Sequence, residues 1–244
     1  MYCTNDFRIT KIDGNKYKGI VEVEVSISDI AKEYILKADK IDISTRSRLA
    51  RLGSHLHILE NKYPWIEGNV LKAIIGYINY STPIIYHVGD EVGRFYVYND
   101  DEKITGKELE KIVVENKIPG EINKDDIIEI ELTDNYYIPK KSIEIEAREV
   151  IKNPDKYIFK CKNKDWSTLC NDVTILETKK IKIPSDVFGL IIETTYFGST
   201  FHLNSRVIDP GWEGNLIVEV RTYEDPVFFE KPKLLVELYK RIKI

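Results

Sequence analysis

Short runs of alternating apolar and charged residues recur along the whole chain. The alternation is regular in VEVEV (21–25), IIEIEL (127–132) and SIEIEA (142–147). A period of two places apolar side chains on one face of a strand and charged ones on the other, so these runs predict half-buried antiparallel strands. Other runs rich in β-branched residues and bounded by turn-forming residues predict further strands. They are KIDIS (40–44), VLKAIIGYI (70–78), KIKIP (180–184) and NLIVEV (215–220).

One segment, TGKELEKIVVENKIPG (105–120), has helical spacing instead. It opens on Thr105 and has Glu108 at the spacing of a capping box, and it ends before a Pro-Gly pair. Its apolar residues recur at intervals of three and four and so share one face. The pattern predicts a single short helix in a chain made otherwise of strands.

The chain also repeats itself. RLGSHLHI (51–58) matches YFGSTFHL (196–203) at an offset of 145 residues, and PWIEGNVLKAI (64–74) matches GWEGNLIVEV (211–220) at 146 or 147. Two matches in the same order and at nearly constant offset predict two related β domains, residues 1–100 and 103–244. The histidine shared by the first pair, His57, lies between apolar residues, which favours a packed core or interface histidine.

Composition limits the classes of partner. The 244 residues carry a net charge of -4, which gives no general attraction to nucleic acid or to an anionic membrane. Any bound anion must therefore be held by a local cluster of basic residues. No apolar run is long enough to span a membrane, and the first residues lack the apolar core of a signal peptide. Three cysteines without zinc-type spacing favour a reducing, cytoplasmic setting.

Two segments carry candidate chemistry. RSRLARLG (46–53) alternates three arginines with apolar residues. By itself it is typical of a solvated edge strand, turn or short helix, and the alternative is a pocket that fixes positive charge against an apolar wall. NSRVIDPGWEGNLIVEV (204–220) predicts a hairpin turning at a Pro-Gly pair, with Asp209 and Trp212 on either side. Glu219 then lies between two valines, facing either solvent or a functional site.

Together, RSRLARLG and IDPGWEGNLIVEV resemble the dCTP deaminase and dUTPase superfamily. Residues 89–98, 103–118 and 173–191 resemble further segments of that family, whereas residues 1–39 match none of it. The resemblance implies an all-β fold of two tandem dUTPase-like domains, each a distorted β-barrel or jelly roll, with one short helix at the start of the second. It also implies a hydrolase of pyrimidine deoxynucleoside triphosphates.

The two repeats depart from the family in complementary ways. Repeat 1 keeps Arg46, Ser47 and Arg51, but it has no acidic residue from position 68 to 89, where the strand glutamate is expected. Repeat 2 keeps its acidic hairpin, but it has no Arg or Lys from position 183 to 203. In the family, one subunit supplies the hairpin and another supplies the arginine-serine segment. The sequence therefore predicts one composite site between the repeats.

The resemblance assigns catalytic and binding roles. In deamination of dCTP, Glu219 would move the proton while Ser47 and Arg51 orient the attacking water and stabilise charge. In hydrolysis of dUTP to dUMP and diphosphate, Asp209 would activate the water. Substrate contacts would come from Arg46, Arg206 and Trp212. Mg²⁺ would be bound through the nucleotide phosphates, with no metal ligands from the protein.

Three alternatives remain open. Family members are trimers of single domains, so the chain could form a homotrimer or remain a monomer. The family closes its site with a glycine-containing tail, whereas this chain has no glycine after Gly214, and Arg94 replaces an expected glutamine. These departures favour a second interpretation, a non-catalytic descendant that binds a nucleotide or a protein. The choice between dCTP and dUTP is also left open.

Overall fold

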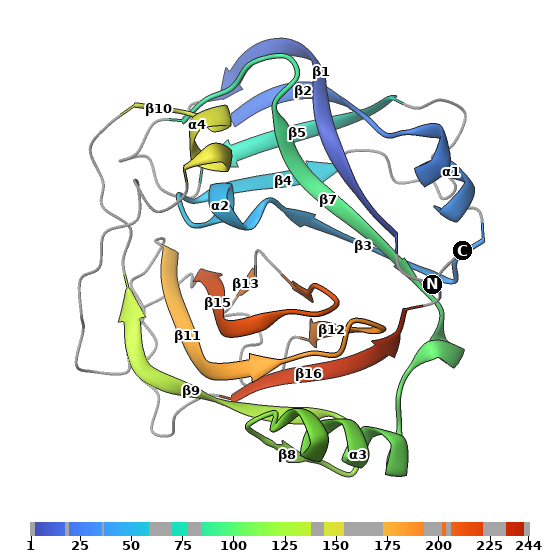
Figure 1. Ribbon diagram of the computed structural model, residues 1–244. Helices are drawn as coiled ribbons and strands as arrows, with labels where there is room; N and C mark the ends of the chain where they lie inside the picture. The colour runs from blue at the N-terminus through green and yellow to red at the C-terminus, as the bar shows by residue number, and fades with distance from the viewer. Residues whose placement is uncertain are drawn as a thin grey trace. The chain divides into compact units, whose positions relative to one another are not determined.

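The computed structural model describes ten stretches of the chain: residues 3–17, 20–35, 37–58, 70–77, 84–137, 144–153, 173–192, 202–203, 206–221 and 233–241. The chain divides into two units (Figure 1). Unit 1 comprises residues 98–138 and 161–244 with the first two residues, and unit 2 comprises residues 3–97 and 139–160. Strands dominate both units, which confirms the prediction of an all-β chain.

Unit 2 is built on a sheet of six strands in the order β3-β7-β1-β2-β5-β4. A separate parallel pair joins β6 (Ile84–Ile85) to β10 (Ile145–Glu146). The six strands are β1 (Cys3–Tyr17), β2 (Ile20–Ser26), β3 (Lys40–Thr45), β4 (Ser54–Ile58), β5 (Val70–Tyr77) and β7 (Glu91–Tyr98). The alternating run at 21–25 forms β2 as predicted, with Val23 and Val25 buried and Glu24 only partly buried.

Unit 1 is built on an eight-stranded sheet in the order β13-β15-β11-β9-β16-β12-β14, with β8 also paired to β9. Its apolar core is filled from both halves of this sheet and from helix α3 (Gly106–Asn116). The strands are β8 (Glu121–Ile122), β9 (Ile128–Tyr137), β11 (Val173–Lys182), β12 (Val187–Ile192), β13 (His202–Leu203), β14 (Val207–Ile208), β15 (Glu213–Arg221) and β16 (Lys233–Lys240).

The two sheets share one strand order. Counted along the chain, unit 2 has its strands in the order third, sixth, first, second, fifth, fourth. Unit 1 has the same order when β8 and β14 are left out and the sheet is read from β12 to β13, as β12-β16-β9-β11-β15-β13. The repeated sequence segments fall on corresponding strands, the first pair on β4 and β13 and the second pair on β5 and β15. The matched part of the second pair before β5 lies outside the described residues.

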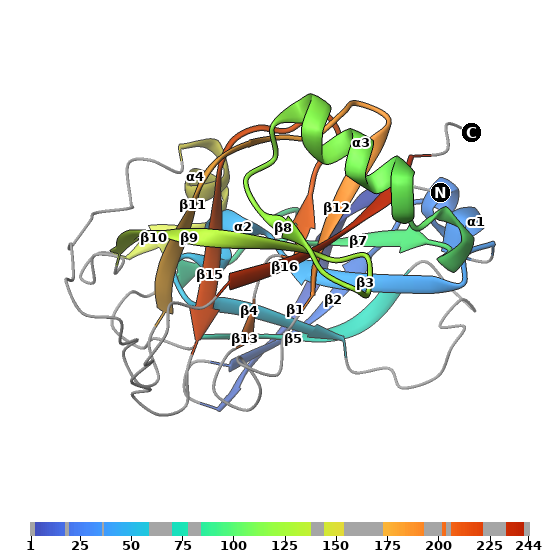
Figure 2. The ribbon, with the colours of Figure 1, turned by 90° about the horizontal axis from the view of Figure 1, so that it is seen from below.

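The predicted helix forms as α3. Its first residue follows Thr105, and Lys117 ends it in the left-handed conformation with φ 52°. Leu109 is fully buried, whereas Val114 on the opposite side is 74% exposed. Figures 1 and 2 both draw α3 beside β8, so the apolar face of the helix completes the core of unit 1.

Two shorter helices were not predicted, α1 (Asp29–Ile35) and α4 (Ala147–Lys152), whereas α2 (Ser47–Ala50) falls in the segment for which a short helix was one alternative. Each spans two turns or fewer, so its apolar residues recur too few times to show a helical period. The prediction of a strand over 142–147 is mostly wrong in its described part. Only β10 is a strand there, because Ala147 and Val150 are spaced to bury one face of α4.

A second buried cluster lies on the other side of β12 and β16 in unit 1. Tyr98, Phe188 and Tyr239 pack together, with the last two rings stacked at a centroid distance of 5.3 Å. The Tyr239 hydroxyl donates to Glu237, 2.8 Å away, and the other oxygen of Glu237 accepts from Lys103 at 2.8 Å. Burial, followed by the hydrogen bond to Glu237 and then the charge of that carboxylate, raises the pKa of Tyr239 far above its usual value, so the phenol stays protonated.

Replacing Leu109 with alanine should destabilise unit 1 by about 2–5 kcal/mol, because it leaves a cavity beneath α3. Val114→Ala is the matched control on the same helix. It should be neutral or slightly stabilising, since alanine has the higher helix propensity and the valine is exposed. Urea unfolding followed by circular dichroism measures both. Equal stability of the two variants would contradict the packing of α3.

Candidate functional site

The arginine-rich segment 46–53 forms the short helix α2 and the turn that follows it. The backbone N–H of Arg51 donates to the carbonyl of Ser47 at 3.0 Å, and Gly53 closes the turn with φ 86°. Leu49 and Ala50 are fully buried, whereas Arg48 is exposed. The alternation of arginine and apolar residues thus comes from a helical turn with one side packed in unit 2, not from a strand.

Arg46 immediately precedes α2 and is held by a carboxylate. Its guanidinium donates to Oε2 of Glu91 at 2.5 Å, and these two side chains are 17% and 19% exposed. The other oxygen of Glu91 accepts from Arg8 on the neighbouring strand β1. Glu91 is thus shared between two guanidinium groups, those of Arg8 and Arg46. Unit 2 therefore presents a fixed cationic group beside α2.

Ser47 and Arg51 are both partly buried. They are four residues apart on one helical turn, so their side chains share a face of that turn. Unit 2 thus brings the predicted phosphate-binding and catalytic residues of repeat 1 into one short segment. Arg48 lies between them in sequence, but its side chain is in solvent.

The acidic turn of unit 1 spans Asp209 to Trp212. The N–H of Trp212 donates to the carbonyl of Asp209 at 3.1 Å, and Gly211 adopts φ 74°. The flanking strands have different partners, because β14 pairs with β12 whereas β15 pairs with β11 and β13. The prediction of a hairpin is therefore wrong, and the turn instead crosses from one half of the sheet to the other.

A second crossing loop, between β11 and β12, lies against this turn. The N–H of Gly211 donates to the carbonyl of Pro184 at 3.0 Å, and the N–H of Ile183 donates to the carbonyl of Trp212 at 2.8 Å. These two hydrogen bonds fix the backbone that carries Asp209. The turn is thus positioned by main-chain contacts that do not depend on any side chain.

The side chains of the turn differ in exposure. Asp209 is partly buried, and Trp212 is 39% exposed, with its indole Nε1 3.4 Å from the carbonyl of Gly214. Arg206 is held against β12, since its Nε donates to the carbonyl of Ile191 at 3.3 Å. An aromatic face and a carboxylate are therefore presented together where a ligand could contact them.

Glu219 is completely buried, with 0% of its surface exposed. It pairs with Ile175 of β11 and faces away from the core of unit 1, which contains its neighbours Val218 and Val220. The solvent-facing interpretation of this glutamate is wrong. A carboxylate buried in a strand is costly, and such groups are concentrated at functional sites.

The corresponding position of repeat 1 is apolar. Counting from the shared Glu-Gly-Asn, Glu219 matches Ala73 of β5. Ala73 is also fully buried and pairs with Val23 of β2, as Glu219 pairs with β11. Unit 2 therefore keeps the strand and its register without the acid.

The predicted site residues form two groups, one in each unit. Arg46, Ser47 and Arg51 lie together in unit 2. In unit 1, the acidic turn at 209–212 leads directly into the strand that carries Glu219. The composite site that would combine both groups stays a prediction.

Sequence reasoning missed Glu91 and Arg8, which hold Arg46 in place. Glu91 lies 45 residues after Arg46 in sequence, in a segment assigned only a strand. Arg8 lies in the unmatched N-terminal segment. No local spacing connects these residues, because Arg8 meets Glu91 through the pairing of β1 with β7, and Arg46 meets it because β3 lies beside β7 in the sheet.

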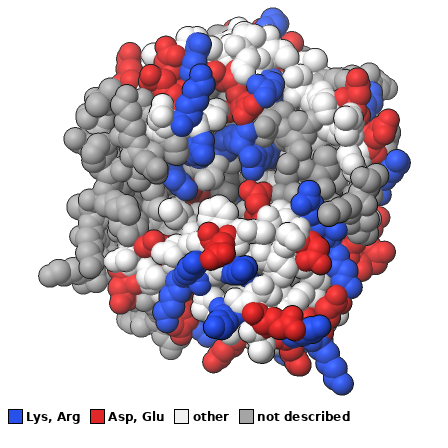
Figure 3. Space-filling view, viewed as in Figure 1, with Lys and Arg blue, Asp and Glu red and all other residues white. Residues whose placement is uncertain are grey.

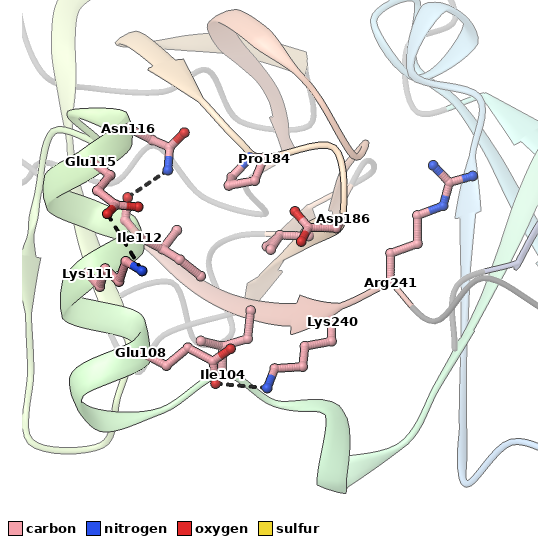
Figure 4. Close-up of a pocket in the computed structure, with 11 residues that line it drawn as sticks. Ile104, Glu108, Lys111, Ile112, Glu115, Asn116, Pro184, Asp186, Lys240 and Arg241 are labelled. Atoms are coloured by element: carbon pink, nitrogen blue, oxygen red, sulfur yellow. Dashed lines mark hydrogen bonds and ion pairs between the residues drawn. The ribbon is translucent and has the colours of Figure 1, made fainter.

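A cavity of about 540 Å³ lies in unit 1 between α3, the loop at Pro184 and the end of β16 (Figure 4). Its rim carries the ion pair of Lys240 with Glu108, at 2.8 Å, and that of Lys111 with Glu115, at 3.8 Å. None of the predicted site residues lines it. The cavity borders the loop at Pro184, which is hydrogen-bonded to the acidic turn. No side chain of the turn itself lines the cavity.

Charges of both signs are mixed over the face of the molecule drawn in Figure 3. Among the residues that the structure places, no group of three or more histidine, cysteine or acidic side chains is arranged to hold a metal ion. In that same part of the chain, no helix has the length and apolar content needed to cross a lipid bilayer.

Comparison with known proteins identifies the fold. No protein-family model matches the sequence, and a search of curated proteins finds no match. The structure is similar to the crystal structure of 2'-deoxycytidine 5'-triphosphate deaminase from Agrobacterium tumefaciens, with a TM-score of 0.70 and 13% sequence identity. The similarity covers 98% of this chain and 89% of that one. It confirms an all-β, barrel-like fold of the dCTP deaminase type.

Replacing Glu91 with glutamine should destabilise the protein by about 1–3 kcal/mol, because it removes an ionic partner of the largely buried Arg46 guanidinium. Glu115→Gln breaks an exposed ion pair on α3 and should change stability by less than about 0.5 kcal/mol. Chemical denaturation compares the two. A Glu91→Gln protein as stable as wild type would show that this carboxylate does not hold Arg46.

Proposed function

We propose that this protein hydrolyses pyrimidine deoxynucleoside triphosphates, by deamination of dCTP, by hydrolysis of dUTP to dUMP and diphosphate, or by both. The observation that carries the proposal is the complete burial of Glu219 in β15, close in sequence to an acidic turn, in a chain with the fold of a dCTP deaminase. The turn that carries a second carboxylate and an exposed aromatic residue leads into the strand that holds this buried carboxylate, and such a set fits a site that moves protons on a bound base.

We also propose that the chain arose by duplication of one β domain. The shared strand order of the two sheets supports this origin, as does the placement of both repeated segments on corresponding strands. After a duplication, each copy can lose the residues that the other supplies. The replacement of a buried glutamate by Ala73 in the corresponding strand fits such a loss.

One site would then draw on both copies. Unit 2 would supply Arg46, Ser47 and Arg51, and unit 1 would supply the acidic turn and the buried glutamate. The complementary losses of the two repeats support this arrangement, since neither repeat alone retains both the cationic and the acidic set. Fixed guanidinium groups suit a triphosphate because each can bind two of its oxygens at once.

In deamination, a water molecule adds to C4 of cytosine and ammonia leaves. Glu219 would take a proton from this water and pass it to the leaving amino group. Ser47 would hold the water, and Arg51 would stabilise the negative charge that develops as the water loses its proton. The site needs no metal ion for this step, because the carboxylate itself acts as acid and base.

In diphosphate release, a water molecule attacks the α-phosphorus of dUTP and diphosphate departs. Asp209 would orient and deprotonate this water from its partly buried position on the turn. Mg²⁺ prefers phosphate and carboxylate oxygens, so it would be held through the nucleotide phosphates and would neutralise their charge. Trp212 would pack against the sugar and base, and Arg206 would lie beside them.

One observation favours the second candidate function, binding without turnover. Glu91 already binds Arg46, so a triphosphate must compete with this carboxylate for the guanidinium. Arg8 binds the same carboxylate, so both guanidinium groups are already engaged by Glu91 before a nucleotide arrives. A nucleotide-binding descendant that has lost turnover fits this arrangement.

Thermal unfolding with added nucleotide distinguishes the functions. We expect dCTP or dUTP with Mg²⁺ to raise the unfolding temperature, because a ligand of the folded state stabilises it, and ATP to have no effect. Product analysis should then show dUTP or dUMP. Stabilisation without product would support the binding function. No stabilisation by dCTP, dUTP or dTTP would contradict both.

Glu219→Gln should abolish deamination, by at least about 100-fold in kcat, while nucleotide binding is retained. Asp209→Asn should stop release of diphosphate. Matched controls are Glu213→Gln, an exposed glutamate of the same strand, and Asp186→Asn on the adjoining loop, both of which should keep wild-type turnover. Coupled assays for ammonia and diphosphate measure the two reactions. Wild-type turnover in the Glu219 or Asp209 variant would remove that residue from the mechanism.

A further inference from the structure

Strand β4 carries two of the chain's four histidines at alternate positions, His55 and His57. Their ring centroids are 4.0 Å apart and the ring planes meet at 63°. His57 is exposed and His55 is partly buried, so the core alternative for His57 is wrong, and the interface alternative stays a prediction. The side chain of His202, its match in the other repeat, lies outside the described residues.

The strand presents both imidazoles on one face. Residues two apart in a strand point the same way, and here Ser54 and Leu56 point the other way and are buried. Among the strands that the structure describes, β4 is the last of its sheet. His55 is opposite Gly76 of β5, which has no side chain to fill the space beside it.

We propose that His55 and His57 form a binding site for a divalent transition-metal ion, with Cu²⁺ preferred over Zn²⁺. Imidazole nitrogens bind such ions at about 2.0–2.1 Å, which brings two ligating nitrogens to within about 3–3.5 Å of each other. Rings already in contact reach this spacing by rotating about their side-chain bonds. Cu²⁺ stands above Zn²⁺ in the general order of affinity for nitrogen ligands.

The site has two protein ligands, and water would complete the coordination. In the described part of the chain, no third histidine, cysteine or acidic side chain joins the pair to make a larger group. The ion class also separates this site from the proposed nucleotide chemistry. Mg²⁺ takes oxygen ligands and binds imidazole poorly, so the two sites would select different metals.

Isothermal titration of the untagged full-length protein with Cu²⁺ and Zn²⁺, without nucleotide, tests the proposal. We expect one Cu²⁺ per chain at this site, bound more tightly than Zn²⁺. His55→Ala and His57→Ala should each weaken Cu²⁺ binding at least tenfold. His87→Ala is the matched control, since this histidine is also partly exposed in unit 2 but lies 3.7 Å from Glu146 rather than beside another imidazole.

Electron paramagnetic resonance of the bound Cu²⁺ gives an independent readout, since two ligating nitrogens produce a characteristic hyperfine pattern that either substitution should change. An unchanged unfolding temperature would show that the variants remain folded. Wild-type Cu²⁺ affinity in either the His55 or the His57 variant would overturn the proposal. An equal loss of affinity in His87→Ala would overturn it as well. None of these results depends on nucleotide turnover, so the proposed enzymatic function is tested separately.

Discussion

The register of β15 against β11 determines where the acidic chemistry of unit 1 lies. In the observed register, Val218 and Val220 enter the core and Glu219 points to the opposite face. A slip of one residue would move every side chain of the strand to the other face and place the carboxylate among aliphatic side chains. The slip would also remove Val218 and Val220 from the core, and this loss of apolar burial opposes it. The two hydrogen bonds between the crossing loops fix the register from the other end, because they anchor the residues just before β15.

The sequence predicted the parts of the fold that depend on repeated local patterns. Alternation located β2 and β9, and a capping residue with helical spacing located α3. Short helices were missed because one or two turns contain too few apolar residues to show a period. The 142–147 segment was read as a strand because Ile145 and Ala147 alternate with glutamates, although α4 begins at that alanine. Local alternation did not distinguish a strand from the residues leading into a helix.

The candidate site was only partly predictable for a related reason. The motifs identified Glu219 and the acidic turn, since their spacing is local. They did not indicate that the flanking strands pair with different partners, because strand pairing is set by the whole sheet. The contact of Arg46 with Glu91 was likewise hidden, since β3 and β7, which are far apart in the sequence, must lie side by side before these two residues can meet. Contacts between distant segments depend on the order of strands in the sheets. Local sequence patterns do not show that order, and the expected fold rested on a family resemblance.

The partial exposure of Trp212 gives the acidic turn an intrinsic optical signal. Its indole ring is partly in solvent, while the backbone beneath it is fixed by the adjoining loop. A molecule that settles on this ring would exclude water from one of its faces and shift its fluorescence emission to shorter wavelength. The chain's other two tryptophans lie outside the described residues, and replacing them with phenylalanine would leave Trp212 as the sole source of tryptophan emission. Occupancy of the turn could then be followed without attaching a dye to the protein.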